Sequence, residues 1–336
     1  MTIDPRRRPR RLRTTPAMRR LTAETRLNPA GLVLPMFVQE GITQPVELDS
    51  LPGVKRHTLD SLARAAAEAA EVGLGGVMLF GVPATDKKDS SGSQAVAEDG
   101  ILNRALATVR AEVGDDLVVM ADTCLDEFTT HGHCGVLAPD GSVDNDATLE
   151  IYGAQAVAQA RAGAHMVGPS GMMDHQVAAI RDALDAAGLD NISILAYAAK
   201  YASAFYGPFR EAVACSLDGD RRSYQMDPAN RREGRLETSL DIAEGADMVM
   251  VKPAGYFLDV LADIAASSPV PVAAYQVSGE YAMIQAAARN GWIDGPAALR
   301  ESVLSIHRAG ANVVLTYAAM ELAQECCDCC DCCDCS

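Results

Sequence analysis

Short apolar segments alternate along the chain with longer, alanine-rich segments in which apolar residues recur at helical spacing. The short segments are rich in valine, isoleucine and leucine, as strands buried on both faces are. Eight of them are predicted to be strands, at residues 32–38, 76–80, 117–121, 165–168, 192–197, 248–251, 270–275 and 313–317. The alternation therefore predicts repeated strand–helix units around a parallel sheet.

Helices are predicted between the strands, at residues 59–71, 101–113, 150–161, 176–187, 236–243, 257–266, 283–289 and 297–308. Gly163, Gly245 and Gly310 each end a helical segment and lead through a similar tripeptide into a strand, as capping glycines do. Eight alternations favour an α/β fold of the (β/α)8 TIM-barrel type over an open doubly wound sheet. Catalytic residues of such barrels lie where strands end and the following loops begin.

Charge and cysteine are distributed unevenly over the 336 residues. Residues 1–26 contain nine arginines and two acids, whereas the rest of the chain has 20 basic and 43 acidic residues. Seven of the ten cysteines lie in the final run CCDCCDCCDC. We therefore expect a basic N-terminal arm (1–26), a barrel (27–325) and a cysteine- and aspartate-rich, low-complexity tail (326–336).

The sequence also argues against several classes of protein. No apolar run approaches the roughly 18 residues of a membrane helix, and no apolar segment follows the arginine-rich start as in a secretory signal. We therefore expect a cytoplasmic protein without a membrane partner, in which Cys124, Cys134 and Cys215 stay reduced. The acidic barrel disfavours a nucleic-acid partner, and the runs GLGG and GPSG do not meet a nucleotide-binding fingerprint.

Two of the five lysines stand at the ends of predicted strands. Lys200 follows the fifth strand and Lys252 the sixth. Neighbouring parallel strands lie about 4.8 Å apart, so both amines are expected to reach one pocket at the barrel mouth. Burial and a second amine both disfavour the ammonium form, which makes a lysine a nucleophile near neutral pH. The alternative is a lysine that reaches out to solvent or pairs with a carboxylate.

The loop after the third strand has the composition of a metal site. Asp122, Cys124, Asp126 and Cys134 lie within thirteen residues, together with two histidines. Three protein ligands on a loop leave one coordination position open for substrate, and thiolates favour zinc, whereas a carboxylate admits harder ions. The alternative is a pair of small buried thiols beside a polar loop.

A long segment, residues 201–234, separates the fifth strand from the next predicted helix. Its length and aromatic residues predict an active-site lid. Its arginines, Arg210, Arg221 and Arg222, could hold a substrate carboxylate, or else form surface ion pairs. Ser278 follows the seventh strand and Tyr317 ends the eighth, so both hydroxyls are expected to face the same mouth.

Several of these stretches together resemble one known family. They are TCLDEFTTHGHCG, GPSGMMD, YAAKYASAFYGPFREA, GDRRSYQMDPANRRE, EGADMVMVKPA and YQVSGEYAMI. Over about residues 10–323 the sequence resembles the porphobilinogen synthase, or δ-aminolevulinic acid dehydratase, family. The resemblance implies a hydro-lyase of tetrapyrrole (haem) biosynthesis that condenses two molecules of 5-aminolevulinate to porphobilinogen and two waters. It implies Schiff bases on Lys200 for the A-side substrate and on Lys252 for the P-side substrate.

The resemblance also assigns the other site residues. It implies A-side carboxylate contacts from Arg210, Arg221 and Gln225, and P-side contacts from Ser278 and Tyr317. It gives Asp122 a part in proton transfer and Glu237 a part in binding an activating, allosteric magnesium. It further implies a homo-octamer in which the basic arm embraces a neighbouring barrel.

Two positions depart from the family pattern. The family's zinc site has three cysteines, but here the middle one is Asp126, so we expect a weakened zinc site of Cys124, Asp126 and Cys134. Gly171 stands where many relatives carry aspartate, so no substrate role is assigned to it.

Two other readings of the sequence remain open. A class I aldolase or another Schiff-base barrel would explain one lysine, but neither the second lysine nor the metal loop. Alternatively the tail is the functional part of a metal-buffering protein, since its seven thiols and three carboxylates could collect soft metal ions.

Overall fold

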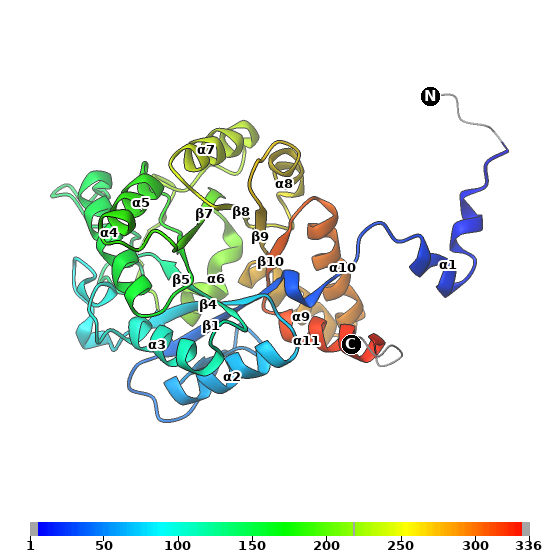
Figure 1. The fold of residues 1–336 in the computed structure, drawn as a ribbon, viewed down its shortest axis with the longest axis horizontal. Helices are drawn as coiled ribbons and strands as arrows, with labels where there is room; N and C mark the ends of the chain where they lie inside the picture. The colour runs from blue at the N-terminus through cyan, green and yellow to red at the C-terminus, as the bar shows by residue number, and fades with distance from the viewer. Residues whose placement is uncertain (1–5, 218, 331–336) are drawn as a thin grey trace.

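The computed structural model describes residues 6–217 and 219–330, with side chains as far as Cys326 in the last helix. Eight parallel strands form a closed barrel with helices around it (Figure 1). They are β1 (Leu32–Gln39), β4 (Gly76–Val82), β5 (Val118–Thr123), β6 (Met166–Pro169), β7 (Ser193–Lys200), β8 (Met248–Lys252), β9 (Val272–Tyr275) and β10 (Val313–Leu315). β10 pairs with β1, which closes the barrel and excludes the open sheet. The prediction of a TIM barrel is confirmed.

Helices follow each strand or its loop. They are α2 (Leu59–Glu71), α3 (Ile101–Val113), α4 (Asn145–Arg161), α5 (Gln176–Ala186), α7 (Arg231–Ala243), α8 (Leu258–Ala265), α9 (Ser278–Arg289), α10 (Gly295–Arg308) and α11 (Ala319–Cys330). Gly163, Gly245 and Gly310 have φ values of 110°, 107° and 115°, so each predicted capping glycine adopts a backbone conformation that other residues rarely take.

The spacing of apolar residues did not predict several short elements or the starts of two helices. A two-strand extension, β2 (Val46–Glu47) and β3 (Lys55–His57), is added to the sheet beside β1. The lid contains a 3-10 turn (Ala204–Tyr206) and the short helix α6 (Gly207–Ala212). Helices α4 and α7 each begin five residues before their predicted starts, because their first turns are polar and carry no apolar period.

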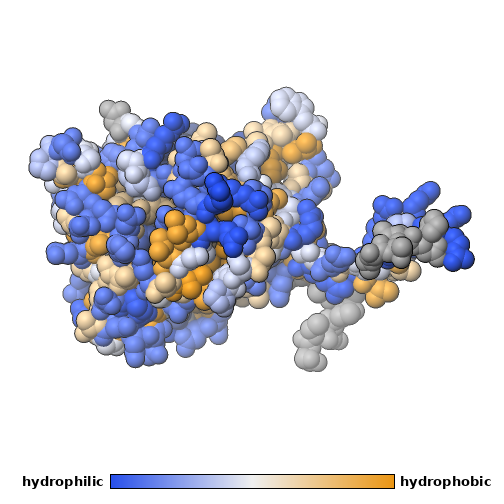
Figure 2. Space-filling view, turned by 90° about the horizontal axis from the view of Figure 1, so that it is seen from above, coloured by the Kyte–Doolittle hydropathy of each residue, from blue (hydrophilic) through white to orange (hydrophobic). Residues whose placement is uncertain are grey.

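The two ends of the described chain lie outside the strand barrel (Figure 1). The arm, with a 3-10 turn (Pro9–Arg13) and α1 (Pro16–Leu21), projects away from the barrel (Figures 1 and 2). Helix α11 packs against β1 and the 3-10 turn Pro29–Gly31 that precedes it. It also crosses the predicted boundary between barrel and tail, whose residues 331–336 lie outside the described chain. Within the described ranges, no helix is long and apolar enough to cross a membrane.

Candidate active site

Lys200 and Lys252 end neighbouring strands and face each other in the ladder. The register of β7 against β8 shifts by one residue between Ala196 and Ala199, and Lys200 then pairs with Lys252. An extra residue of this kind re-aims the side chains that follow it. Both lysines are 5% exposed, and both line the same small cavity. The structure therefore brings the two predicted lysines together.

The amine of Lys252 lies among aromatic rings. Its Nζ is 4.4 Å from the ring centroid of Tyr275, 5.0 Å from that of Tyr197 and 5.2 Å from that of Phe209. Burial in this setting, helped by the positive charge of Lys200, lowers the pKa of Lys252 to about 7. A large fraction of Lys252 is therefore a neutral, nucleophilic amine at neutral pH.

The amine of Lys200 lies in a more polar setting. It donates a hydrogen bond to the carbonyl of Ser170, in the loop after β6. The hydroxyl of Ser170 donates to Oδ2 of Asp122 at 3.2 Å, while Oδ1 of that carboxyl has no hydrogen-bond partner. Burial raises the pKa of Asp122 to about 6, although both lysines oppose the rise. Asp122 is thus a buried carboxyl able to hold or release a proton near neutral pH.

Cys124, Asp126 and Cys134 form a buried cluster beside the lysines. One ligand atom from each lies within 4.8 Å of the others, so the donor set can close around one metal ion and fits zinc. The two histidines of the loop are not part of this cluster. His131 forms a hydrogen bond with the carbonyl of Ser90, and His133 forms one with the hydroxyl of Tyr224.

The two thiols of the cluster differ. A hydrogen bond with Cys124, supported by the charge of Arg221, lowers the pKa of Cys134 to about 7. Burial, together with the hydrogen bond that it shares with Cys134, raises the pKa of Cys124. One thiolate therefore forms readily at neutral pH, and a bound cation would favour the second.

Arg221 is tied to the metal loop. Its Nη2 lies 2.8 Å from Oδ2 of Asp126 and donates to the carbonyl of Gly132, also at 2.8 Å. Burial alone would raise the pKa of the Asp126 carboxyl, but the guanidinium overcomes this and holds that pKa well below its usual range. Its Nε has no hydrogen-bond partner, although Arg221 lines the cavity. The predicted A-side contact and the predicted metal ligand are therefore paired, which the sequence did not indicate.

Helix α4 supports the loop with a buried polar face. Gln159 donates to the carbonyl of Asp122 at 2.8 Å and Gln155 to that of Cys124 at 2.9 Å. Tyr152 donates to the carbonyl of Cys134 at 2.6 Å. We did not predict these residues as part of the site. Their spacing of three and four residues, with polar groups on a helix beside a metal-like loop, was the available signal.

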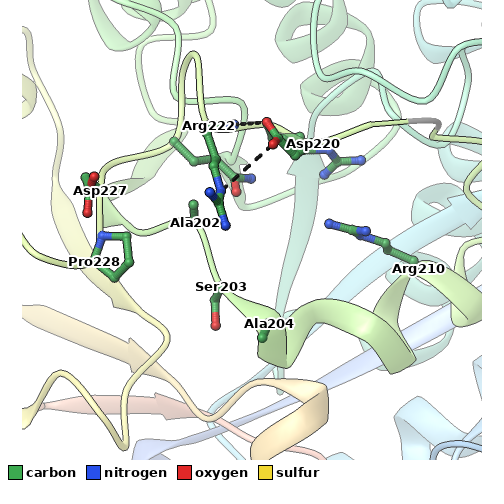
Figure 3. Close-up of a pocket in the computed structure, with 10 residues that line it drawn as sticks. Ala202, Ser203, Ala204, Arg210, Asp220, Arg222, Asp227 and Pro228 are labelled. Atoms are coloured by element: carbon green, nitrogen blue, oxygen red, sulfur yellow. Dashed lines mark hydrogen bonds and ion pairs between the residues drawn. The ribbon is translucent and has the colours of Figure 1, made fainter.

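Two connected cavities lie under the lid. The larger, of about 460 Å³, is lined by Arg210, Arg221, Arg222 and Gln225, and in Figure 3 the guanidinium groups of Arg210 and Arg222 approach each other across it. The smaller, of about 20 Å³, shares three of these residues and reaches both lysines. The inner space holds little more than a water molecule, so groups around it must move before an organic molecule can reach the lysines.

Three other predicted residues, Ser278, Tyr317 and Glu237, lie on α9, after β10 and on α7. The hydroxyl of Ser278 accepts from the backbone N–H of Phe209 at 3.0 Å, and so ties the start of α9 to the lid. Tyr317, two residues beyond β10, shares a hydrogen bond of 3.1 Å with Tyr275, one of the rings around Lys252. Glu237 lies on α7, where it lines a neighbouring surface cavity that shares Arg222 and Gln225 with the larger lid cavity.

Known proteins are similar to this chain over nearly its whole length. Residues 6–325 match the family described as delta-aminolevulinic acid dehydratase. Relatives of that name include the proteins of Streptomyces coelicolor (63% identity, covering 94% of this chain and 96% of the relative) and Escherichia coli (49%, covering 95% and 97%). The relative from Mycobacterium tuberculosis is 64% identical, over 96% of this chain and 98% of its own.

A solved structure is similar over the same length. The Toxoplasma gondii delta-aminolevulinic acid dehydratase (porphobilinogen synthase), in complex with the reaction product porphobilinogen, has a TM-score of 0.92 and 43% identity. The alignment covers 95% of this chain and 91% of that one. The chain therefore belongs to the delta-aminolevulinic acid dehydratase family, the porphobilinogen synthases, which are hydro-lyases.

Proposed function

We propose that the protein condenses two molecules of 5-aminolevulinate to porphobilinogen, with one substrate bound as a Schiff base on each of Lys200 and Lys252. The pairing of these two buried lysines across β7 and β8, at one cavity, is the observation that carries the proposal. Two ketone substrates need two amines side by side, and a barrel with one Schiff-base lysine would need only one.

The chemistry follows from the two amines. Each attacks the keto carbon of one substrate, and water leaves as the imine forms. A protonated imine acidifies the neighbouring C–H bond and makes the imine carbon electrophilic, so one carbon–carbon and one carbon–nitrogen bond can join the substrates. Carbon–carbon bond formation at one imine is followed by elimination of its lysine. The incoming amino group attacks the other imine carbon and displaces the second lysine, so both return as free amines, and loss of a proton completes the pyrrole. Asp122 lies near both amines and is assigned to proton transfer. Holding both substrates together is worth about 7–11 kcal/mol.

Side chains around the cavity would hold the substrate carboxylates. We assign Arg210, Arg221 and Gln225 to the A-side substrate because all three line the space that leads to Lys200. The amide nitrogen of Gln225, Nε2, has no hydrogen-bond partner and is free to donate. We assign Ser278 and Tyr317 to the P-side substrate, since Tyr317 contacts a ring of the Lys252 pocket.

Cys124, Asp126 and Cys134 would hold a zinc ion. Zinc bound there would act as a Lewis acid towards a substrate or water group in its open position. Because Arg221 holds the Asp126 carboxylate, zinc and the guanidinium share this ligand, which supports a site weaker than one of three thiolates. At the α7 cavity, Glu237 lies with Asp174 and Glu233, and burial together with the charges of these acids raises the pKa of Glu237. A magnesium ion there would relieve their repulsion.

The arm fits a role in a homo-octamer. Its arginines are exposed, and Leu12 and Leu21 are 50% and 75% exposed on the same projecting segment (Figure 2). A basic segment with exposed leucines is suited to the acidic barrel of a second copy. Deleting residues 1–26 should give smaller assemblies in light scattering and lower activity; an unchanged octamer would contradict this. The free thiols Cys124, Cys134 and Cys215 suit a reducing, cytoplasmic setting.

Borohydride trapping tests the central proposal. Protein incubated with 5-aminolevulinate and reduced should carry adducts on both lysines by peptide mass spectrometry, and should form porphobilinogen before reduction. An aldolase-type enzyme would carry an adduct on one lysine and form no pyrrole. Truncation after Glu325 gives the matching control for the tail, because synthase activity should survive while any excess metal binding disappears.

A further inference from the structure

We propose that Tyr152 is a positioning residue of the thiol cluster, and that Gly171 is the residue that gives it room. The proposal rests on the assignment of Cys124, Asp126 and Cys134 as metal ligands. The contacts of the Tyr152 hydroxyl are with Cys134 and Cys124, and Gly171 packs against that hydroxyl. Their effect passes through the two cysteines.

The hydroxyl of Tyr152 reaches both cysteines. It donates a hydrogen bond of 2.6 Å to the carbonyl of Cys134, and its oxygen lies 3.8 Å from Sγ of Cys124. The whole side chain is buried, so water does not compete for these contacts. The two cysteines are ten residues apart on a loop, and the Tyr152 hydroxyl contacts both, so it helps to fix their relative positions. Groups behind metal ligands orient them in this way, and losing one costs roughly 10–100-fold in metal affinity.

Tyr152 belongs to a row of buried side chains on α4 that all contact the loop. Thr148 accepts from the N–H of Val136, and Gln155 donates to the carbonyl of Cys124. These contacts hold the backbone, and a hydrophobic residue in the helix could not supply them. Tyr152 differs from the rest of the row because its polar atom also faces a ligand sulfur. A purely structural tyrosine would need only the carbonyl.

Gly171 explains why a tyrosine fits. It lies in the loop after β6, and a Cβ placed on it would overlap the hydroxyl oxygen of Tyr152 and lie 2.7 Å from its Cζ. Real Cβ atoms do not approach other atoms so closely. Any larger residue at 171 would therefore push the phenol away from the two cysteines. The glycine and the tyrosine act as one unit, which makes their effects non-additive.

Cobalt(II) binding tests the proposal on the full chain. Tyr152→Phe removes only the hydroxyl, so it should weaken Co²⁺ binding by about 10–100-fold in a chelator competition and alter the thiolate-to-cobalt charge-transfer spectrum. Tyr201→Phe is the matched control, because the Tyr201 hydroxyl also bonds a carbonyl, that of Asn230, at 3.0 Å. It should leave affinity and spectrum unchanged. Circular dichroism and thermal unfolding establish that each variant is folded.

A second pair of variants tests the partnership with Gly171. Gly171→Ala alone should weaken Co²⁺ binding in the same direction as Tyr152→Phe. In the Tyr152→Leu variant, which removes the ring, adding Gly171→Ala should change the dissociation constant by less than about twofold. Additive losses would overturn the partnership, and an unchanged Tyr152→Phe would overturn the role of Tyr152. A wild-type chain that binds no Co²⁺ would instead contradict the metal site itself, while leaving the two-lysine chemistry to be judged by borohydride trapping.

Discussion

The active site contains two buried lysines whose surroundings differ in polarity. Lys252 and Lys200 occupy paired positions on β8 and β7 and are equally buried. Around Lys252 the neighbours are aromatic rings, and its pKa falls to about 7. Around Lys200 they are the Ser170 carbonyl and the thiol loop, with the Tyr197 ring centroid 5.8 Å away, while the Asp122 carboxyl acts on both lysines.

The difference shows how one fold position supports two roles. The aromatic side can stabilise a neutral amine but offers few groups that move protons. The polar side holds the Cys134 thiol, whose pKa is about 7, and the carboxyl of Asp122, whose pKa is about 6, lies near both amines. We therefore expect metal chemistry on the Lys200 side, a preformed nucleophile on the Lys252 side, and proton transfer by Asp122 at either amine.

The largest expected effect comes from removing the amine on the aromatic side. Lys252→Met keeps an unbranched side chain among the rings and should lower kcat/KM by about 10⁴-fold or more. Its melting temperature should not fall, because burial of Lys252 opposes the charged form that the unfolded chain prefers. Borohydride should still trap 5-aminolevulinate on Lys200. Lys200→Met is the mirror control, and a variant of Lys252 that traps on neither lysine would show that the two sides are not separable.

Breaking the ion pair on the polar side should cost stability. Arg221→Met leaves the Asp126 carboxylate buried without its partner, and should lower the unfolding free energy by about 3–5 kcal/mol in urea at pH 7. The double variant with Asp126→Asn should recover most of the loss.

The pH dependence of this loss has a defined sign. The folded-state pKa of Asp126 is lowered, so the pair stabilises the protein above the ordinary carboxyl pKa and the contribution fades as pH falls below about 4. The difference between wild type and Arg221→Met should shrink over the same range. A difference that stays constant down to pH 3 would argue that the loss comes from packing.

The sequence alone predicted the positions of Lys200 and Lys252 but not their exact pairing. Apolar runs and strand ends located both lysines, because a fully buried parallel strand has a clear composition. That they face each other depends on the register shift between Ala196 and Ala199, which leaves no mark in the apolar pattern. The barrel itself followed from eight alternations, whereas β2, β3 and α6 are too short to show a period.

The metal loop gives a second case. Its composition identified Cys124, Asp126 and Cys134, and the structure places their ligand atoms together. The pairing of Asp126 with Arg221, 95 residues later, is a tertiary contact that no local pattern encodes. Tyr152 was missed for a related reason, since a buried tyrosine on a helix is usually read as core. Its hydroxyl partners become visible only when α4 lies against the loop.

A smaller effect concerns pH and the aromatic side. Because the pKa of Lys252 is lowered to about 7, its neutral fraction falls roughly tenfold per pH unit well below pH 7, and kcat/KM should fall with it. The ring centroid of Phe209 lies 5.2 Å from Nζ of Lys252. Phe209→Gln replaces this ring with a polar amide, which should ease burial of the ammonium and move the inflection up by about half a unit to one unit. Phe205→Gln, in the lid but stacked on Tyr256, is the control. An inflection that moves down would reverse the assignment of burial as the main cause.

The smallest expected effect is at Tyr317, where the aromatic side meets the proposed P-side carboxylate. Tyr317→Phe keeps the ring against Tyr275 and removes one neutral hydroxyl, which is worth about 1 kcal/mol. We expect KM for 5-aminolevulinate to rise by roughly three- to tenfold, with kcat changed by less than about twofold, since a binding contact alone is lost. Tyr275→Phe removes the other hydroxyl of the same hydrogen bond without removing the proposed contact, so its KM should stay near that of the wild type. Equal changes in both variants would mean that the Tyr275–Tyr317 hydrogen bond itself, and not a substrate contact, sets the P-side affinity.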